Sequence, residues 1–92
     1  MLHHIQRSGQ IRKTLGSNLL SDHAWTEIGR SLKLSVRELE IARGVFNNQI
    51  ESAIAQNLAI SSHTVHTHLN RLFKKLWVTT RTELILTVIN EL

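Results

Sequence analysis

One stretch decides the fold: Ile60-Ser61-Ser62-His63-Thr64-Val65-His66-Thr67-His68-Leu69-Asn70-Arg71-Leu72-Phe73-Lys74-Lys75-Leu76. Its apolar residues Val65, Leu69, Leu72 and Leu76 recur at the spacing of one face of an α-helix, with Phe73 beside them. The other face carries short hydrogen-bonding groups and cations. Ser61 can accept a hydrogen bond from the first turn, so we predict that it caps the helix. The pattern predicts an amphipathic helix over residues 62–76 whose polar face suits a DNA major groove.

The residues just before this stretch predict a second, shorter helix. Ile50, Ile54 and Leu58 recur every four residues, which indicates a helix over residues 49–57 with its own apolar side. A short turn over residues 58–60 leads into the cap at Ser61. Two helices joined by a short turn, the second with a polar outer face, form a helix-turn-helix, here about residues 49–76.

Several separate motifs resemble the LuxR/GerE-type DNA-binding domain. They are, in chain order, Leu34-Ser35-Val36-Arg37-Glu38, Ile54-Ala55, Leu58-Ala59-Ile60-Ser61, Thr64-Val65, His68-Leu69, Lys75-Leu76, Val78 and Arg81-Thr82-Glu83. The resemblance runs from residue 34 to residue 92 without a gap. It implies an all-α, four-helix domain of a bacterial transcription regulator, which binds double-stranded DNA and dimerises through its last helix.

The chain departs from the family pattern at several positions. The family has glycine where this chain has Asn48, Ala59 and Trp77. Asn tolerates a left-handed turn, but a bulky residue at positive φ is an outlier, so we predict that the turn at Trp77 is not left-handed or that the helix runs on. Ser52 stands where the family often has a lysine that binds phosphate. The family's capping box at the start of the shorter helix is lost, and similar chemistry from Asn48 predicts an earlier start.

Composition sets bounds on the class of protein. Ninety-two residues allow one domain, and the absence of proline, with little strand-type alternation, favours an all-helical chain. There is no cysteine, which fits a reducing cytoplasm. No apolar run approaches the ~20 residues of a membrane span, and the first ten residues lack the apolar core of a signal peptide. We therefore expect a cytoplasmic protein with no membrane partner.

The positive charge is uneven along the chain. Residues 1–34 hold five Lys/Arg against two Asp/Glu, whereas residues 35–92 hold six against five. A nearly neutral domain must bind phosphate through the placement of its cations.

The N-terminal third divides into an arm and an additional helix. Residues 1–20 have no helical period and contain Arg7, Arg12 and Lys13. Two interpretations are a flexible leader and a basic arm that touches DNA; a remnant of a larger regulator is a third. From residue 21 onward we predict a helical DNA-binding domain. Its first helix begins after Ser21 and buries Trp25, Ile28 and Leu32.

Two capping boxes mark the starts of further helices. Ser35 with Glu38, and Thr80 with Glu83, each place a hydroxyl at the N-cap and a carboxylate three residues later. After Ser35 we predict a buried face made of Leu39, Ala42, Val45 and Phe46. Gly44 in that helix costs roughly 1 kcal/mol relative to alanine, which indicates close packing against another helix.

The helix after Thr80 is apolar on more than one side. Ile85, Val88, Ile89 and Leu92 lie at helical spacing, with Leu84 and Leu86 to either side. One helix in so small a domain cannot bury both sides in its own core, so the surplus predicts a two-fold contact. We expect a homodimer interface made of Leu84, Ile85, Val88, Ile89 and Leu92.

Eight residues of the helix over 62–76 are our candidates for DNA contacts. The motif position of Thr64 implies a hydroxyl that holds phosphate. His66, Thr67 and Asn70 share a face, and we expect them at base edges; His66 stands where the family has a lysine, and its charge depends on pH. We expect His63, Arg71, Lys74 and Lys75 to hold phosphates.

The histidines of this helix also permit a metal interpretation, which we do not favour. His66 and His68 lie about 200° apart around the helix, so one ion cannot easily join them with His63. His68 is a family position, and we expect it to pack and hydrogen-bond inside the domain. No nucleophile or ligand cluster accompanies any acid. We predict no metal, no cofactor and no catalytic site.

Two other interpretations stay open from the sequence alone. A protein-interaction module that kept the fold and lost DNA affinity is motivated by the missing lysine positions and by Trp77. A sigma-factor region-4 module has a similar helix-turn-helix, although His68-Leu69 and Arg81-Thr82-Glu83 favour the LuxR/GerE type. RNA polymerase is a further candidate partner.

Overall fold

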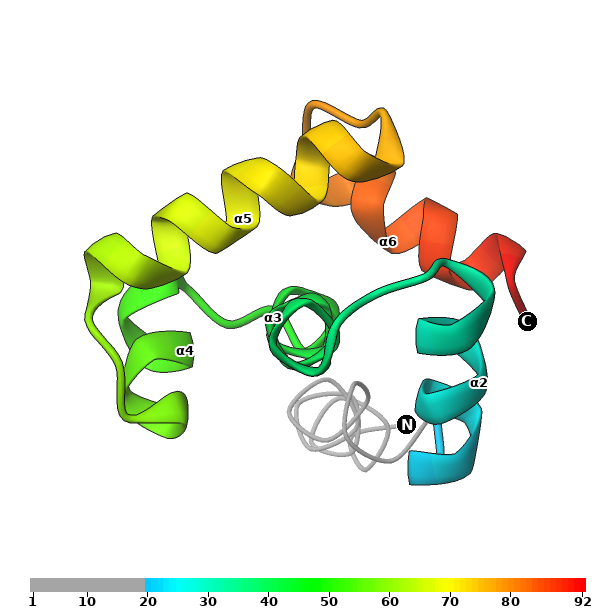
Figure 1. Ribbon diagram of the computed structural model, residues 1–92, viewed down its shortest axis with the longest axis horizontal. Helices are drawn as coiled ribbons and strands as arrows, with labels where there is room; N and C mark the ends of the chain where they lie inside the picture. The colour runs from blue at the N-terminus through cyan, green and yellow to red at the C-terminus, as the bar shows by residue number, and fades with distance from the viewer. Residues whose placement is uncertain (1–19) are drawn as a thin grey trace, which may run out of the picture.

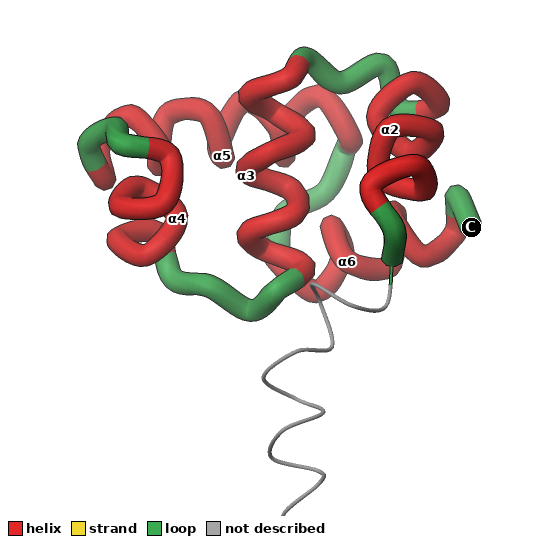
Figure 2. Tube along the Cα trace, turned by 90° about the horizontal axis from the view of Figure 1, so that it is seen from below, coloured by secondary structure: helices red, strands yellow, loops and turns green. Residues whose placement is uncertain are grey.

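The computed structural model describes residues 20–92, which form five α-helices without strands. They are α2 (Asp22–Ser31), α3 (Val36–Phe46), α4 (Glu51–Leu58), α5 (Ser62–Leu76) and α6 (Arg81–Asn90). α3 lies in the middle, with α4 on one side of it and α2 on the other (Figures 1 and 2). α5 is the longest helix and runs past α3 towards α6. The predicted all-α fold is confirmed. None of these helices is long and apolar enough to cross a bilayer.

Side-chain caps fix where four of the helices begin. The hydroxyls of Ser21, Ser35, Ser61 and Thr80 each accept a hydrogen bond from the backbone N–H three residues later. The capping boxes predicted at Ser35 and Thr80 are both complete, because Glu38 and Glu83 also bond back to the N-cap N–H groups. These helix starts are therefore set by residues only three positions apart in the sequence.

The main core joins α3, α4, α5 and α6. Its buried residues are Ile41, Ala42, Val45, Ile54, Ala55, Val65, Leu69, Leu72 and Leu84. Val65, Leu69 and Leu72 occupy the buried side of α5, as predicted, and Leu76 and Phe73 pack partly against the same core. Ile41 is fully buried although the sequence pattern did not single it out. α3 is covered on several sides, so one apolar face does not describe it.

A second cluster attaches α2 to the domain. Leu20, Trp25 and Ile28 pack with Val88 of α6, and Leu39 and Phe46 of α3 lie against this cluster. The Trp25 and Phe46 rings meet edge to face, 5.3 Å apart. Leu20, which the sequence assigns to the arm, is therefore part of the packed structure. The remaining predicted arm, with Arg7, Arg12 and Lys13, lies outside the described residues.

Four helices end in a left-handed residue that is not glycine. These residues are Lys33, Asn48, Ala59 and Trp77, with φ between 56° and 60°. After each of them, the next N–H bonds to the carbonyl five residues back, as Val78 N–H does with Phe73 O at 3.0 Å. This hydrogen bond satisfies a terminal carbonyl, which offsets the roughly 1–2 kcal/mol cost of the left-handed conformation. The prediction for Asn48 is confirmed, and the prediction that Trp77 avoids this conformation is wrong.

The shorter helix of the helix-turn-helix starts later than predicted. α4 begins at Glu51, and its N-cap residue Ile50 makes no side-chain capping bond. An earlier start is excluded because Asn48 is left-handed and Gln49 N–H bonds back to Gly44 O at 3.0 Å. Asn48 and Gln49, where the sequence predicted the start of the next helix, instead form the hydrogen-bonded C-terminal end of α3.

α6 divides its apolar residues between the interior and the surface. Leu84 and Val88 are buried within the protomer, at 1% and 0% exposure. The prediction that these two residues form a dimer interface is therefore wrong, because their side chains are already covered by α3, α5 and α2. Leu86, Ile89 and Leu92 remain exposed, and Ile85 is partly exposed.

Candidate nucleic-acid interface

α4 and α5 are joined by a tight connection that fixes the start of α5. The left-handed Ala59 closes α4, and Ile60 N–H bonds to Ala55 O at 3.0 Å. Ser61 then accepts the backbone N–H of Thr64 at 3.0 Å, and the two hydroxyls lie 2.8 Å apart. The Thr64 hydroxyl, expected at a phosphate, is thus part of the cap at the first turn of α5.

The outer face of α5 is polar and free of acids. His63, Asn70, Arg71 and Lys74 are all exposed. The ion pairs formed within residues 20–92 do not involve Arg71 or Lys74. Both cations are therefore available to an anionic partner. Their charge lies towards the C-terminal end of α5, where the helix dipole also favours cations.

Thr67 differs from its neighbours on this face. It is half-buried, and its hydroxyl donates to His63 O at 3.1 Å. This bond uses the hydroxyl hydrogen within the helix. The oxygen lone pairs and the methyl group remain for any base contact.

His66 is held by a residue that the sequence analysis missed. Its Nδ1 lies 3.0 Å from Oε2 of Glu51, in the first turn of α4. The imidazole is about half exposed, with 56% of its side-chain surface accessible. No local signal in the sequence reveals this pair, because it depends on how α4 crosses α5.

Lys75 points towards α3 and away from the face formed by Asn70 and Lys74. Its Nζ lies 2.9 Å from Oε1 of Glu38, the carboxylate of the first capping box. The Ser35 N–H bond to this carboxylate lowers the pKa of Glu38 below its usual 4.5, and Lys75 lowers it further. The expectation that Lys75 holds phosphate stays a prediction, and its charge already has a partner within the protein.

His68 occupies an intermediate position. It is partly buried, and none of the buried residues of the described structure is polar or charged. The prediction that it lies inside the domain is therefore only partly met. Within residues 20–92, His, Asp and Glu side chains do not gather into a group able to hold a metal ion.

Arg81 connects the last helix to the start of the helix-turn-helix. Its Nη1 donates to Gln49 O at 2.6 Å, just before α4. Arg81 belongs to the Arg81-Thr82-Glu83 motif, and this motif was the feature of the sequence that could have drawn attention to Arg81. Glu83 of the same motif accepts hydrogen bonds from Thr79 and Thr80, and the Thr79 bonds are the main reason that its pKa is lowered.

Two helices joined at a left-handed residue, the second capped by Ser61 and with an acid-free polar face, define a helix-turn-helix DNA-binding protein. The chain belongs to the family described as bacterial regulatory proteins, luxR family, whose GerE model matches residues 32–88. Neither a curated protein nor a solved structure matches the chain. The resemblance noted from the motifs is confirmed, and the sigma-factor alternative is not favoured. The protein is accordingly a DNA-binding transcription regulator.

Proposed function

We propose that the protein recognises specific sequences of duplex DNA by placing α5 in the major groove. The observation that carries this proposal is the outer face of α5, where Asn70, Arg71 and Lys74 are exposed and the two cations have no ion-pair partner among residues 20–92. An α-helix fits the major groove, and an amide next to two cations combines base reading with phosphate binding.

The residues divide into two groups by chemistry. Asn70, Thr67 and His66 read base edges, with Asn70 able to make a bidentate pair with adenine. His63, Arg71 and Lys74 bind phosphates. The capped start of α5, with Thr64 in its first turn, lies close to the phosphate backbone of the bound DNA in this arrangement. Lys75 has a lesser role because Glu38 neutralises it.

We further propose that two copies bind together through α6. Leu86 and Ile89 are 54% and 45% exposed, and Leu92 extends the same apolar strip. Burial of this strip against its symmetry mate removes it from water and sets the spacing of two half-sites on DNA. The dimer would act in the cytoplasm, with RNA polymerase as a partner at the regulated promoter.

Selection from a random duplex pool tests the proposal. We expect an enriched, palindromic sequence and an affinity that falls with salt, since phosphate binding releases counterions. Loss of enrichment in an Asn70→Ala variant that still binds DNA non-specifically would support the reading role. Absence of salt-dependent DNA binding would instead favour a protein-interaction module, for which Trp77, 93% exposed, is the clearest feature.

A further inference from the structure

We propose that Glu51 is a positioning residue that makes His66 an acceptor for the amino group of a base. The inference rests on the proposed function, because it concerns how α5 reads the major groove. It adds to that function a specificity-determining contact and the residue that sets it. The pair joins the two helices of the helix-turn-helix, with Glu51 on α4 and His66 on α5.

The geometry fixes which nitrogen of the ring is used inside the protein. Nδ1 of His66 lies 3.0 Å from Oε2 of Glu51. An ionised carboxylate can only accept hydrogen bonds, so Nδ1 must carry a proton in this contact. Nε2, on the opposite side of the ring, does not take part in it, and more than half of the side chain is exposed.

The tautomer then decides which bases can be read. In the neutral ring with the proton on Nδ1, Nε2 is an acceptor. In the major groove, hydrogen-bond donors are the amino groups of adenine N6 and cytosine N4. The neutral His66 held by Glu51 therefore selects a base with an amino group at its contact position and disfavours guanine and thymine there.

Protonation reverses this selection. A second proton makes Nε2 a donor, which suits guanine O6 and N7. Glu51 is the charged group facing His66 from α4, and His63 is the titratable group one turn earlier on α5. No Lys, Arg, Asp or Glu occupies the positions three or four residues from His66 on its own helix. A protonated His66 should therefore move the base preference at this position towards guanine.

The place of His66 on α5 is consistent with such a contact. His66 precedes Asn70 by four residues, so the two side chains lie one above the other on neighbouring turns. Both are exposed. A contact by His66 would fall on a base pair next to the one read by Asn70, which lets one binding site report on both residues.

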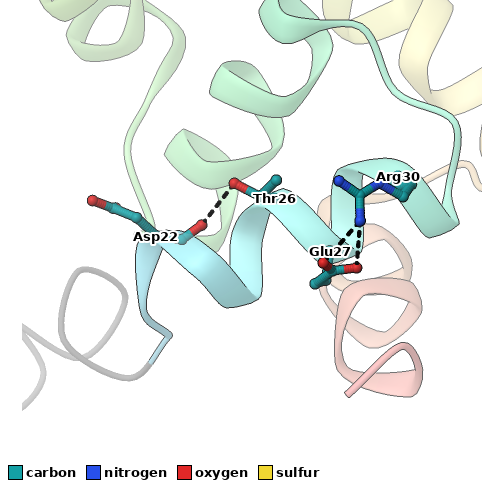
Figure 3. Close-up of polar contacts among 4 residues, drawn as sticks. All are labelled: Asp22, Thr26, Glu27 and Arg30. Atoms are coloured by element: carbon teal, nitrogen blue, oxygen red, sulfur yellow. Dashed lines mark hydrogen bonds and ion pairs between the residues drawn. The ribbon is translucent and has the colours of Figure 1, made fainter.

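The experiment compares three proteins on duplex pools at pH 8 and fixed ionic strength. They are the wild type, Glu51→Gln, and Glu27→Gln as a control. Glu27 lies on α2, paired with Arg30 at 2.9 Å (Figure 3), so its replacement removes the same charge away from α5. A fourth protein, His66→Ala, identifies the base pair that His66 contacts. Circular dichroism verifies that each variant is folded.

At pH 8 we expect the wild type to prefer a duplex that keeps the amino group of the contacted adenine or cytosine about three- to tenfold over one in which that amino group is replaced by hydrogen, the range of one net hydrogen bond. The enriched sequence shows which of the two it is. Glutamine can accept from or donate to Nδ1, so Glu51→Gln should reduce the preference to within about twofold. The Asn70 position and the salt dependence should stay unchanged, and Glu27→Gln should match the wild type.

Three results would overturn the inference. Glu51→Gln with the full wild-type preference would show that Glu51 does not position the ring. A wild type that binds the duplexes with and without this amino group equally at pH 8 would show that Nε2 is not an acceptor. Either result is compatible with the proposed function, provided that Asn70→Ala still removes the preference at the base pair that Asn70 reads. A wild type without base preference at any position overturns the inference and the proposed function together.

Discussion

Gly44 of α3 lies directly against Ile54 of α4, so closely that a Cβ on Gly44 would stand 2.7 Å from Cγ1 of Ile54. Gly44→Ala gains about 1 kcal/mol of helix propensity, but overpacking costs about 1–3 kcal/mol. We expect a net loss in the free energy of unfolding, measured by urea denaturation. Gly29→Ala is the control, because its Cβ would meet the terminal methyl of Leu39 at 3.0 Å. Equal effects of the two substitutions would contradict this explanation.

Asn70 should determine the preference at one base pair. Asn70→Ala removes an amide able to pair bidentately with adenine, an interaction worth about 1–3 kcal/mol of discrimination. We expect competition assays to show a flattened preference at that base pair and nearly unchanged affinity for random DNA. Equal losses on specific and random DNA would mean that Asn70 does not read a base.

Lys74 and Lys75 should contribute differently to the salt dependence of DNA binding, although they are neighbours in the sequence. Lys74→Ala removes a cation that has no ion-pair partner among residues 20–92, so the slope of log K against log salt should fall by about 1. Lys75→Ala should change the slope less, because Glu38 lies 2.9 Å from the Lys75 ammonium. Glu38→Gln releases Lys75 and should steepen the slope. Identical slopes for both lysine variants would remove this distinction.

The α6 dimer should depend on its exposed apolar residues. Leu86→Asp or Ile89→Asp places a charge in the proposed interface without disturbing the protomer core. Sedimentation with a palindromic duplex should show two wild-type chains per duplex and one chain for either variant. Val36→Asp, on α3 and also exposed, serves as the control. A wild type that stays at one chain per duplex at saturation would exclude the dimer.

Acid should destabilise the protein through its two capping-box carboxylates. The pKa values of Glu38 and Glu83 are both lowered in the folded state from 4.5, the first mainly by the Ser35 N–H and the second mainly by Thr79. Their contribution is therefore present above about pH 4.5 and is lost as pH falls through the lowered folded-state values.

Glu38→Gln and Glu83→Gln should accordingly approach the wild type in thermal stability as pH falls from 7 to 3. Raised salt should weaken the Lys75 contribution to Glu38 but leave the backbone hydrogen bonds in place. A gap to the wild type that stays constant across this pH range would show that neither carboxylate is linked to folding.

Local chemistry explains what the sequence could predict. The caps at Ser21, Ser35, Ser61 and Thr80 depend on residues only three positions apart, and the structure contains all four. The buried side of α5 follows from its apolar spacing. Apolar spacing could not show which side of α6 is buried, because both sides are apolar. The packing of α2 and α3 against α6 decides that Val88 and Leu84 are covered.

Contacts between helices limited the prediction of the candidate site. Glu51 with His66 and Glu38 with Lys75 join residues 15 and 37 positions apart, and no periodicity relates them. The left-handed Trp77 was mispredicted for another reason. Bulky residues disfavour positive φ, so the residue type predicted that Trp77 avoids the left-handed conformation. The hydrogen bond from Val78 N–H to Phe73 O stabilises that conformation, and it cannot be read from the sequence.

The two tryptophans of the chain lie in opposite surroundings: Trp25 of α2 is 1% exposed, and Trp77 at the end of α5 is 93% exposed. The protein therefore carries two intrinsic optical probes. Emission from Trp25 comes from an apolar environment beside Phe46 and Arg43 and should shift to longer wavelengths when α2 separates from the domain. The Trp77 ring is surrounded by water, so its emission should respond only to events at the end of α5. In a Trp77→Phe variant, fluorescence reports unfolding alone, so folding and ligand binding can be recorded separately without an attached dye.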